Sequence, residues 1–208
     1  MVVYVPDDAP RRRQSPSPMA GECLRPLNRR QLEDRWGELG DLYIRTTGHE
    51  PAAWDQDRSE FLRRLAGDMR RPGFALLAAE AVVPPGTTVL SGCAYGFPVR
   101  GEGPWWHGLD DCLPSSLLRA AAAGELFAIS EIVVERRVRT HDQDRDWNLA
   151  RRLQRRLLAD HAATLGVMLV ERHDVETLDA LWSWGWRYAP VDARGALLAA
   201  PCRVLILR

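Results

Sequence analysis

Apolar residues recur at three- and four-residue steps twice in the first third of the chain, after residues 21–27, which predict a short strand. In the first segment, 27–46, the recurring positions are Leu32, Trp36, Leu39 and Tyr43. We predict one amphipathic helix there, ended by Gly48.

The second segment, 55–69, predicts another helix, with Asp55 placed to cap its N-terminus. The positions expected to face inward are Phe61, Leu62 and Leu65. Arg63 and Arg64 are expected in solvent. Two helical segments therefore precede the sheet.

Continuous apolar runs of strand length follow these helices. Residues 74–83 and 89–99 are separated by Pro-Pro-Gly-Thr-Thr, which predicts a tight reversal and a β-hairpin. A short helix is predicted around 117–123. Residues 127–137, rich in isoleucine and valine, predict a third long strand.

The clearest helical pattern lies at 148–166, where leucines recur every fourth residue and arginines fall off that line. A strand at 167–172 follows at once, so the strand at 127–137, this helix and the new strand form a βαβ crossover with parallel neighbours. The remaining elements are a helix and two strands, at 173–186, 187–190 and 203–208. This order predicts an α/β fold of the α+β type, with a mixed central sheet flanked by helices.

Length and composition fit one domain, 21–208, preceded by a flexible tail at 1–20 rich in proline and serine. Translation from Met1 or from Met19 stays open. The 28 basic and 28 acidic residues balance, so net charge favours neither nucleic acid nor an anionic membrane as partner. Every basic residue is arginine, which excludes chemistry that requires a lysine.

The cysteines are widely spaced, without a Cys-x-x-Cys pair, which favours reduced thiols over zinc or a disulfide framework: Cys23, Cys93, Cys112 and Cys202. No apolar run approaches the about 18 residues of a membrane span. The N-terminus lacks the charge-then-apolar order of an export signal. We expect a soluble, cytoplasmic protein.

The order of elements, together with two residue strings, resembles the GNAT superfamily of acyl-CoA N-acyltransferases, in its bacterial, actinobacterial type. The strand string Glu-Ile-Val-Val at 131–134, followed by Ala-Arg-Arg-Leu at 150–153, is similar to the family's long strand and next helix. Ser-Trp-Gly-Trp at 183–186 is similar to the end of its last helix. The likeness runs from about Leu24 to the C-terminus and implies the GNAT fold.

The resemblance implies that acetyl-CoA, or another acyl-CoA, binds along the long strand and at the start of the following helix. In the family the pantetheine arm adds to the strand backbone, and the pyrophosphate lies at the helix N-terminus, where amides and the helix dipole favour anions. The cofactor-binding residues so implied are Ile132, Val133, Val134, Arg139, Thr140, Arg145, Asn148, Leu149, Ala150, Arg151 and Asp174.

The phosphate turn departs from the family pattern. Two registers stay open, one starting at Arg145 and one at Arg139, and both place Asn148 where the family has its first glycine. Three acidic residues in the same loop weaken anion binding: Asp142, Asp144 and Asp146. Their spacing suggests calcium, but Trp147 and Leu153 occupy the required glycine and glutamate positions, so no metal is predicted.

For catalysis the resemblance implies Glu131 as the base that removes the proton of the acceptor amine. The alternative is a strand residue that faces solvent or pairs with an arginine. Leu181 stands where the family often has a tyrosine that protonates the leaving thiolate. Trp184 and Trp186 are expected in the core. The aromatic loop residues are as consistent with a pocket as with the core: Trp105, Trp106 and His107.

The leading hypothesis is an N-acyltransferase that moves an acetyl or other acyl group from acyl-CoA to the amine of a small molecule by direct attack. A catalytically degenerate GNAT-fold binding or assembly protein is the main alternative, because of the acidic loop and of Leu181. A GNAT-fold enzyme with altered acyl chemistry in a biosynthetic pathway is a third. A homodimer is left open.

Overall fold

The computed structural model describes residues 22–47, 50–83, 85–100, 113–135, 148–190 and 202–208. Their strands form one sheet of seven, in the order β1-β2-β3-β4-β5-β7-β6. All neighbours are antiparallel except β4 and β5, which are parallel and joined through α6, as the crossover prediction requires. The strands are β1 (Cys23–Leu27), β2 (Ala75–Val83), β3 (Thr87–Val99), β4 (Leu126–Val134), β5 (Leu165–Glu171), β6 (Arg187–Tyr188) and β7 (Cys202–Leu207).

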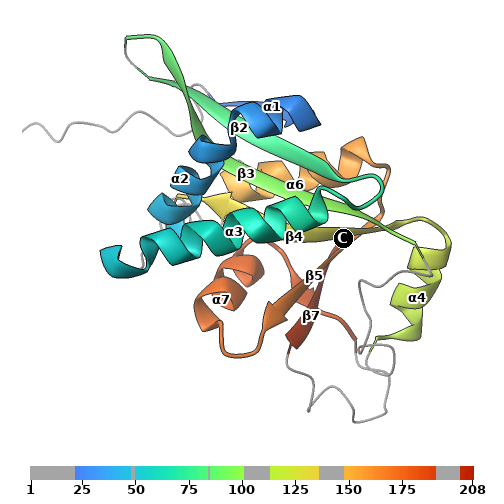
Figure 1. The fold of residues 1–208 in the computed structure, drawn as a ribbon. Helices are drawn as coiled ribbons and strands as arrows, with labels where there is room; N and C mark the ends of the chain where they lie inside the picture. Colours follow the sequence, from blue (N-terminus) through green and yellow to red (C-terminus); the bar gives the residue numbers. More distant parts are fainter. Residues whose placement is uncertain (1–21, 48–49, 84, 101–112, 136–147, 191–201) are drawn as a thin grey trace, which may run out of the picture.

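Helices cover both faces of this sheet (Figure 1). We call one the α3 face, which packs against α1 (Arg29–Asp34), α2 (Trp36–Thr47), α3 (Trp54–Asp68) and α4 (Ser115–Ala122). We call the other the α6 face, which packs against α6 (Leu149–Asp160) and α7 (Val175–Ser183). A short 3-10 helix, η1 (Pro51–Ala53), precedes α3. The predicted mixed sheet flanked by helices is confirmed.

The single helix predicted over 27–46 is wrong, because the chain leaves helical geometry at Arg35 and starts again as α2. The guanidinium of Arg35 contacts both Glu38 and the buried carboxylate of Glu80 on β2. This break rotates the inward face of α2, so that Leu42 is fully buried whereas the predicted inward residue Trp36 is only partly buried. No glycine or proline marks the break.

The helix α3 agrees with the prediction except at its start. Ala53 occupies the N-cap position and makes no side-chain cap, so the expected cap at Asp55 is wrong. Asp55 lies instead in the first turn, where its negative charge interacts favourably with the positive end of the helix dipole. Phe61 and Leu65 are fully buried on the inward side.

A β-bulge interrupts β4 next to β3. Tyr95 of β3 pairs with Glu131, and the next residue, Gly96, pairs with Ile129. Ser130 is therefore an extra residue without a partner on β3. Such a bulge breaks the strict alternation of a strand and re-aims the side chains that follow it.

The effect of the bulge is visible in the packing of β4. Without it, Glu131 would share a face with Ile129. Instead Ile129 and Ile132 both pack in the core of the α6 face, whereas Val133 packs in the core of the α3 face. Glu131 therefore lies on the α3 face.

A buried polar network lies in the core of the α6 face and links α6 to the segment that follows α7. The indole Nε1–H of Trp186 donates to Oε1 of Gln154 at 2.8 Å, and Nε2 of Gln154 donates to the carbonyl of Trp184 at 2.8 Å. All three side chains are buried, with exposed fractions of 0% for Trp186 and 4% for Trp184, so the prediction that both tryptophans are core residues is confirmed.

In the described part of the chain, no helix is long and apolar enough to cross a membrane.

Candidate functional site

The parallel strands β4 and β5 separate along their length. Their pairing covers only the first residues of β4, Leu126 to Ala128, whereas the pairing of β4 with β3 continues to Val134. Among the described strands, the edge of β4 that faces β5 therefore has no partner beyond Ala128. Unpaired amide and carbonyl groups along such an edge can bind an extended ligand in the way that a further strand would.

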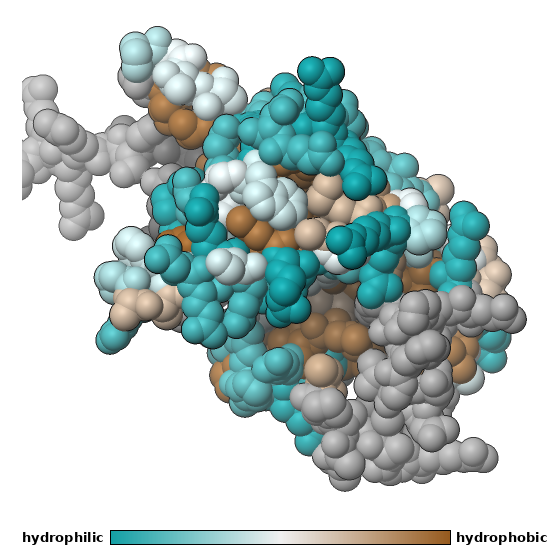
Figure 2. Space-filling view, viewed as in Figure 1, coloured by the Kyte–Doolittle hydropathy of each residue, from teal (hydrophilic) through white to brown (hydrophobic). Residues whose placement is uncertain are grey.

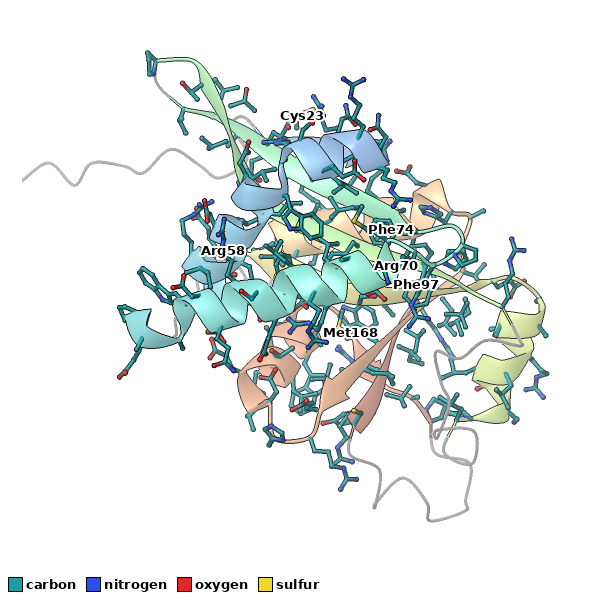
Figure 3. All side chains as sticks on the ribbon, in the orientation of Figure 1. Cys23, Arg58, Arg70, Phe74, Phe97 and Met168 are labelled. Carbon is teal, nitrogen blue, oxygen red and sulfur yellow. The ribbon has the colours of Figure 1, made fainter. Side chains whose placement is uncertain are left out.

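A cavity of about 390 Å³ lies at this separation. Its walls come from β4, β5 and α7, and from α2 and α3 on the α3 face; they include Ser130, Glu131, Ile132, Met168, Leu169, Asp174, Thr177 and Leu181. Met168 lies just below α3 in the view of Figure 3. In the space-filling view, a recessed apolar area at this place is bordered by the polar side chains of α3 (Figure 2).

A second cavity, of about 270 Å³, lies near the C-terminal end of α3. It is lined by Asp68, Arg71 and Tyr95, among others. Four residues line both cavities: Arg64, Ser130, Glu131 and Leu169. The two cavities therefore meet at the bulge of β4.

Glu131 pairs with Arg64 at this meeting point, with 3.4 Å between Oε2 and Nη2. The side chains are 28% and 42% exposed, so water and ligands can reach both groups. Burial alone would lower the pKa of Arg64, but the charge of Glu131 and the hydroxyl of Tyr43 outweigh it, and the pKa is raised. The pair thus keeps a fixed positive charge beside the carboxylate.

Tyr43 of α2 completes this cluster. Its hydroxyl accepts a hydrogen bond from Nη2 of Arg64 at 3.3 Å. Its ring stacks on Phe61, with 4.4 Å between ring centroids and an interplanar angle of 8°, and the guanidinium of Arg64 lies 5.7 Å from the ring centroid. Burial, and secondly the charge of Glu131, raise the pKa of Tyr43 above its ordinary value of 10, so the phenol keeps its proton at neutral pH.

The side chains of the other β4 residues are divided between the cavity and the two cores. Ile132 lines the larger cavity. Val133 and Val134 pack in the cores of opposite faces. Neither residue lines the larger or the smaller cavity, so their expected role in strand addition stays a prediction.

The start of α6 satisfies its own amides. Asn148 is fully buried at the N-cap, and its Oδ1 accepts from the amide of Ala150 at 2.9 Å and from that of Arg151 at 3.4 Å. Leu149 and Ala150 are buried in the core of the α6 face. The guanidinium of Arg151 donates to the carbonyl of Ser183 and so links α6 to α7.

Asp174 and Leu181 both line the larger cavity from α7. The carboxylate of Asp174 caps the helix by accepting from the amide of Thr177 at 3.0 Å.

Several residues singled out in the sequence lie outside the described residues: Trp105, Trp106, His107, Arg139, Thr140, Asp142, Asp144, Arg145 and Asp146.

Sequence reasoning missed Tyr43 and Arg64 as site residues, although they lie with Glu131. Tyr43 was assigned to the apolar face of a helix and Arg64 to solvent, and no local pattern links residues so far apart in the chain. The bulge did leave a signal. Gly96 lies inside the strand β3, and a Cβ there would lie 1.9 Å from the carbonyl oxygen of Ala128, so only glycine permits this approach.

No protein-family model and no curated protein sequence match this chain. Solved structures do. The PaiA N-acetyltransferase of Thermoplasma acidophilum, in complex with coenzyme A, has a TM-score of 0.51 and 8% identity over 90% of this chain and 98% of its own. A protein of Desulfovibrio desulfuricans assigned to the GNAT family of acetyltransferases has a TM-score of 0.51 and 15% identity over 89% and 96%.

At identities this low, the likeness shows the fold. The chain has the fold of the GNAT acetyltransferases, as its element order and its two residue strings predicted. The separation of β4 and β5, the bulge at Ser130 and the cavity between them are then features of this chain within that fold.

Proposed function

We propose that this protein is an N-acyltransferase that moves an acyl group from acyl-CoA, with acetyl-CoA as the first donor to test, to an amine. The observation that carries the proposal is the edge of β4 beyond Ala128, with which no described strand pairs on the β5 side, beside the larger cavity that Glu131 lines. The fold supports the proposal because its neighbours include an acetyltransferase in complex with coenzyme A.

In this proposal the pantetheine arm lies along the backbone of Ile132, Val133 and Val134, and the amine enters through the smaller cavity. The two substrates then meet beside Glu131, which both cavities share. Glu131 removes a proton from the amine, directly or through one water, while the amine nitrogen attacks the thioester carbonyl. A small-molecule amine is the acceptor class that we propose; a peptide amine is the competing class.

A binding or assembly role is the second candidate, and Asn148 favours it. Its side-chain oxygen occupies the amides of Ala150 and Arg151, which in the family pattern would face the pyrophosphate. Arg151 is likewise engaged with the carbonyl of Ser183. Under this alternative the chain keeps the fold without strong binding of acyl-CoA.

Calorimetric titration of acetyl-CoA into the full chain separates the two candidates. We expect micromolar binding to the wild type. Thr177 lines the larger cavity from α7. In the Thr177→Trp variant the indole should occupy the space that the ligand needs, so we expect binding of acetyl-CoA to be abolished.

Asp179→Trp is the matched control, because Asp179 is an exposed residue of the same helix that does not line the cavity. Its affinity should equal that of the wild type. No binding to the wild type at millimolar acetyl-CoA would reject the transferase proposal and favour the binding module. Equal loss in both variants would show that α7, and not the cavity, had been disturbed.

A further inference from the structure

The leaving thiolate of an acyl transfer needs a proton, and α7 does not supply one. Leu181 lines the larger cavity at the place where the family often has tyrosine, and it is almost completely buried. The cavity wall does contain a phenol, however. Tyr43 reaches the same cavity from α2, on the α3 face of the sheet.

We infer that Tyr43 is the general acid of this site and protonates the departing thiolate. The inference rests on the proposed function. It is carried by geometry: Tyr43, Leu181 and the part of β4 beyond its pairing with β5 are walls of one cavity, so a thioester lying along β4 has the phenol in its own compartment.

The hydrogen bonds of Tyr43 suit an acid. Nη2 of Arg64 donates to the phenolic oxygen at 3.3 Å, which leaves the phenolic proton available for a different acceptor. The same nitrogen contacts Glu131 at 3.4 Å. One guanidinium therefore bridges the proposed base and the proposed acid, and the two oxygens are separated by no more than those two contacts combined.

The position of the ring is fixed before any substrate binds. Stacking on Phe61 and the guanidinium of Arg64 hold it from two directions. A catalytic group that is already oriented loses little conformational entropy in the transition state. Tyr95, the other tyrosine near Glu131, lines only the smaller cavity and is 1% exposed, so it is not placed to reach the sulfur.

The reaction balances with these groups alone. The nitrogen of a neutral amine forms a bond to the thioester carbon, the carbon–sulfur bond breaks, and its electron pair leaves on sulfur. The amine proton passes to Glu131 and the phenolic proton of Tyr43 passes to sulfur, giving amide and free thiol. The positive charge of Arg64 stabilises the phenolate until the proton held by Glu131 returns to it, through water where needed.

The test compares two acyl donors that differ in how much they need an acid. Tyr43→Phe removes only the hydroxyl. With acetyl-CoA, whose thiol is weakly acidic, we expect kcat to fall by about 100-fold or more, with an unchanged dissociation constant for acetyl-CoA. With S-acetyl-4-nitrothiophenol, whose thiolate leaves without protonation, the variant and the wild type should react at nearly equal rates.

Tyr188→Phe, at an exposed tyrosine of β6, is the matched control and should equal the wild type with both donors. The assay measures amide formation by mass spectrometry with a polyamine, an aminosugar and a peptide with a free N-terminus as acceptors. A Tyr43→Phe variant that loses no activity with acetyl-CoA, or that loses as much with the aryl thioester, overturns the inference while the transferase function stands. A wild type that transfers to none of these amines from either donor rejects the proposed function first, and the inference with it.

Discussion

Two of the polar clusters in the described part of the chain lie on opposite faces of the same sheet, and they are built differently. The sealed cluster, Gln154 with Trp184 and Trp186, has almost no exposed surface and makes two hydrogen bonds of 2.8 Å. The open cluster, Tyr43, Arg64 and Glu131, is partly exposed, its contacts are 3.3 and 3.4 Å long, and it borders two cavities.

The difference indicates what each cluster is for. Buried amide and indole groups cost free energy unless they are paired, so the sealed cluster fixes how α6 and α7 pack. An exposed ion pair adds little to stability because water screens it. Charged groups kept at a cavity wall with so little structural benefit are therefore the better candidates for chemistry.

Glu131→Gln should produce the largest effect, and it acts on the open cluster. Loss of the base is expected to lower kcat/KM about 10²- to 10⁴-fold, since that is the usual contribution of a general base. The free energy of unfolding should change by less than about 1 kcal/mol, because the carboxylate is partly exposed and its partner Arg64 reaches solvent. Steady-state kinetics and urea denaturation check the two halves of this prediction.

The control for that variant is Glu33→Gln, which removes an exposed carboxylate from a surface pair on α1. It should leave both kinetics and stability unchanged. If Glu131→Gln kept wild-type kcat/KM, the carboxylate would be only a partner of Arg64, the second interpretation of this residue.

Gln154→Leu should produce the opposite result on the sealed cluster. The change keeps the volume of the side chain but leaves the indole N–H of Trp186 and the carbonyl of Trp184 without their partner. We expect the free energy of unfolding to fall by about 2–4 kcal/mol, from two unpaired buried groups. At a temperature where the variant is folded, acyl transfer should persist.

Gln56→Leu, at an exposed position of α3, is its control and should change stability little. Equal stability of the two leucine variants would contradict the role assigned to the sealed cluster. Loss of transfer by folded Gln154→Leu would show that the two clusters are coupled across the sheet.

The smallest expected effect is a loss of stability at high pH, caused by the buried thiol of Cys93. Burial, and secondly the charge of Glu131, raise the pKa of the Cys93 thiol far above its ordinary value of 9. Above pH 9 the unfolded chain releases this proton and the folded chain keeps it, so the unfolded state binds fewer protons and stability falls as pH rises. The fall is at most about 1.4 kcal/mol per pH unit for one group.

Denaturation at pH 8 and pH 10 measures this effect. Cys93→Ala should be less stable than the wild type at pH 8, because it leaves a small cavity. Its stability should nevertheless fall less steeply between the two pH values. Identical slopes in the two proteins would show that the thiol does not titrate as its burial requires.

Element order was largely predictable from the sequence, because long segments with a clear apolar period determine their own structure. The hairpin of β2 and β3 and the crossover through α6 agree with the prediction. The break at Arg35 was not predictable from the local pattern, since one of the partners of Arg35 there, Glu80, lies 45 residues away in the chain. Local patterns do not report pairings of this kind.

The candidate site was predictable only where it coincides with a strand. Glu131 and Ile132 were predicted because they stand in the string that resembles the family's long strand, and both line the larger cavity. Tyr43 and Arg64 were not found, since helices α2 and α3 bring them to β4 only through tertiary packing. For Asn148 only part of the role was predictable. Its position at the start of the helix was expected, but its hydrogen bonds with the amides of Ala150 and Arg151 were not.

The extra residue at Ser130 also bears on how this chain should be aligned with others. A gap-free comparison that counts positions from Leu126 would match Glu131 to residues on the wrong face of a strand without a bulge. A one-residue gap at Ser130 restores agreement on both sides of it.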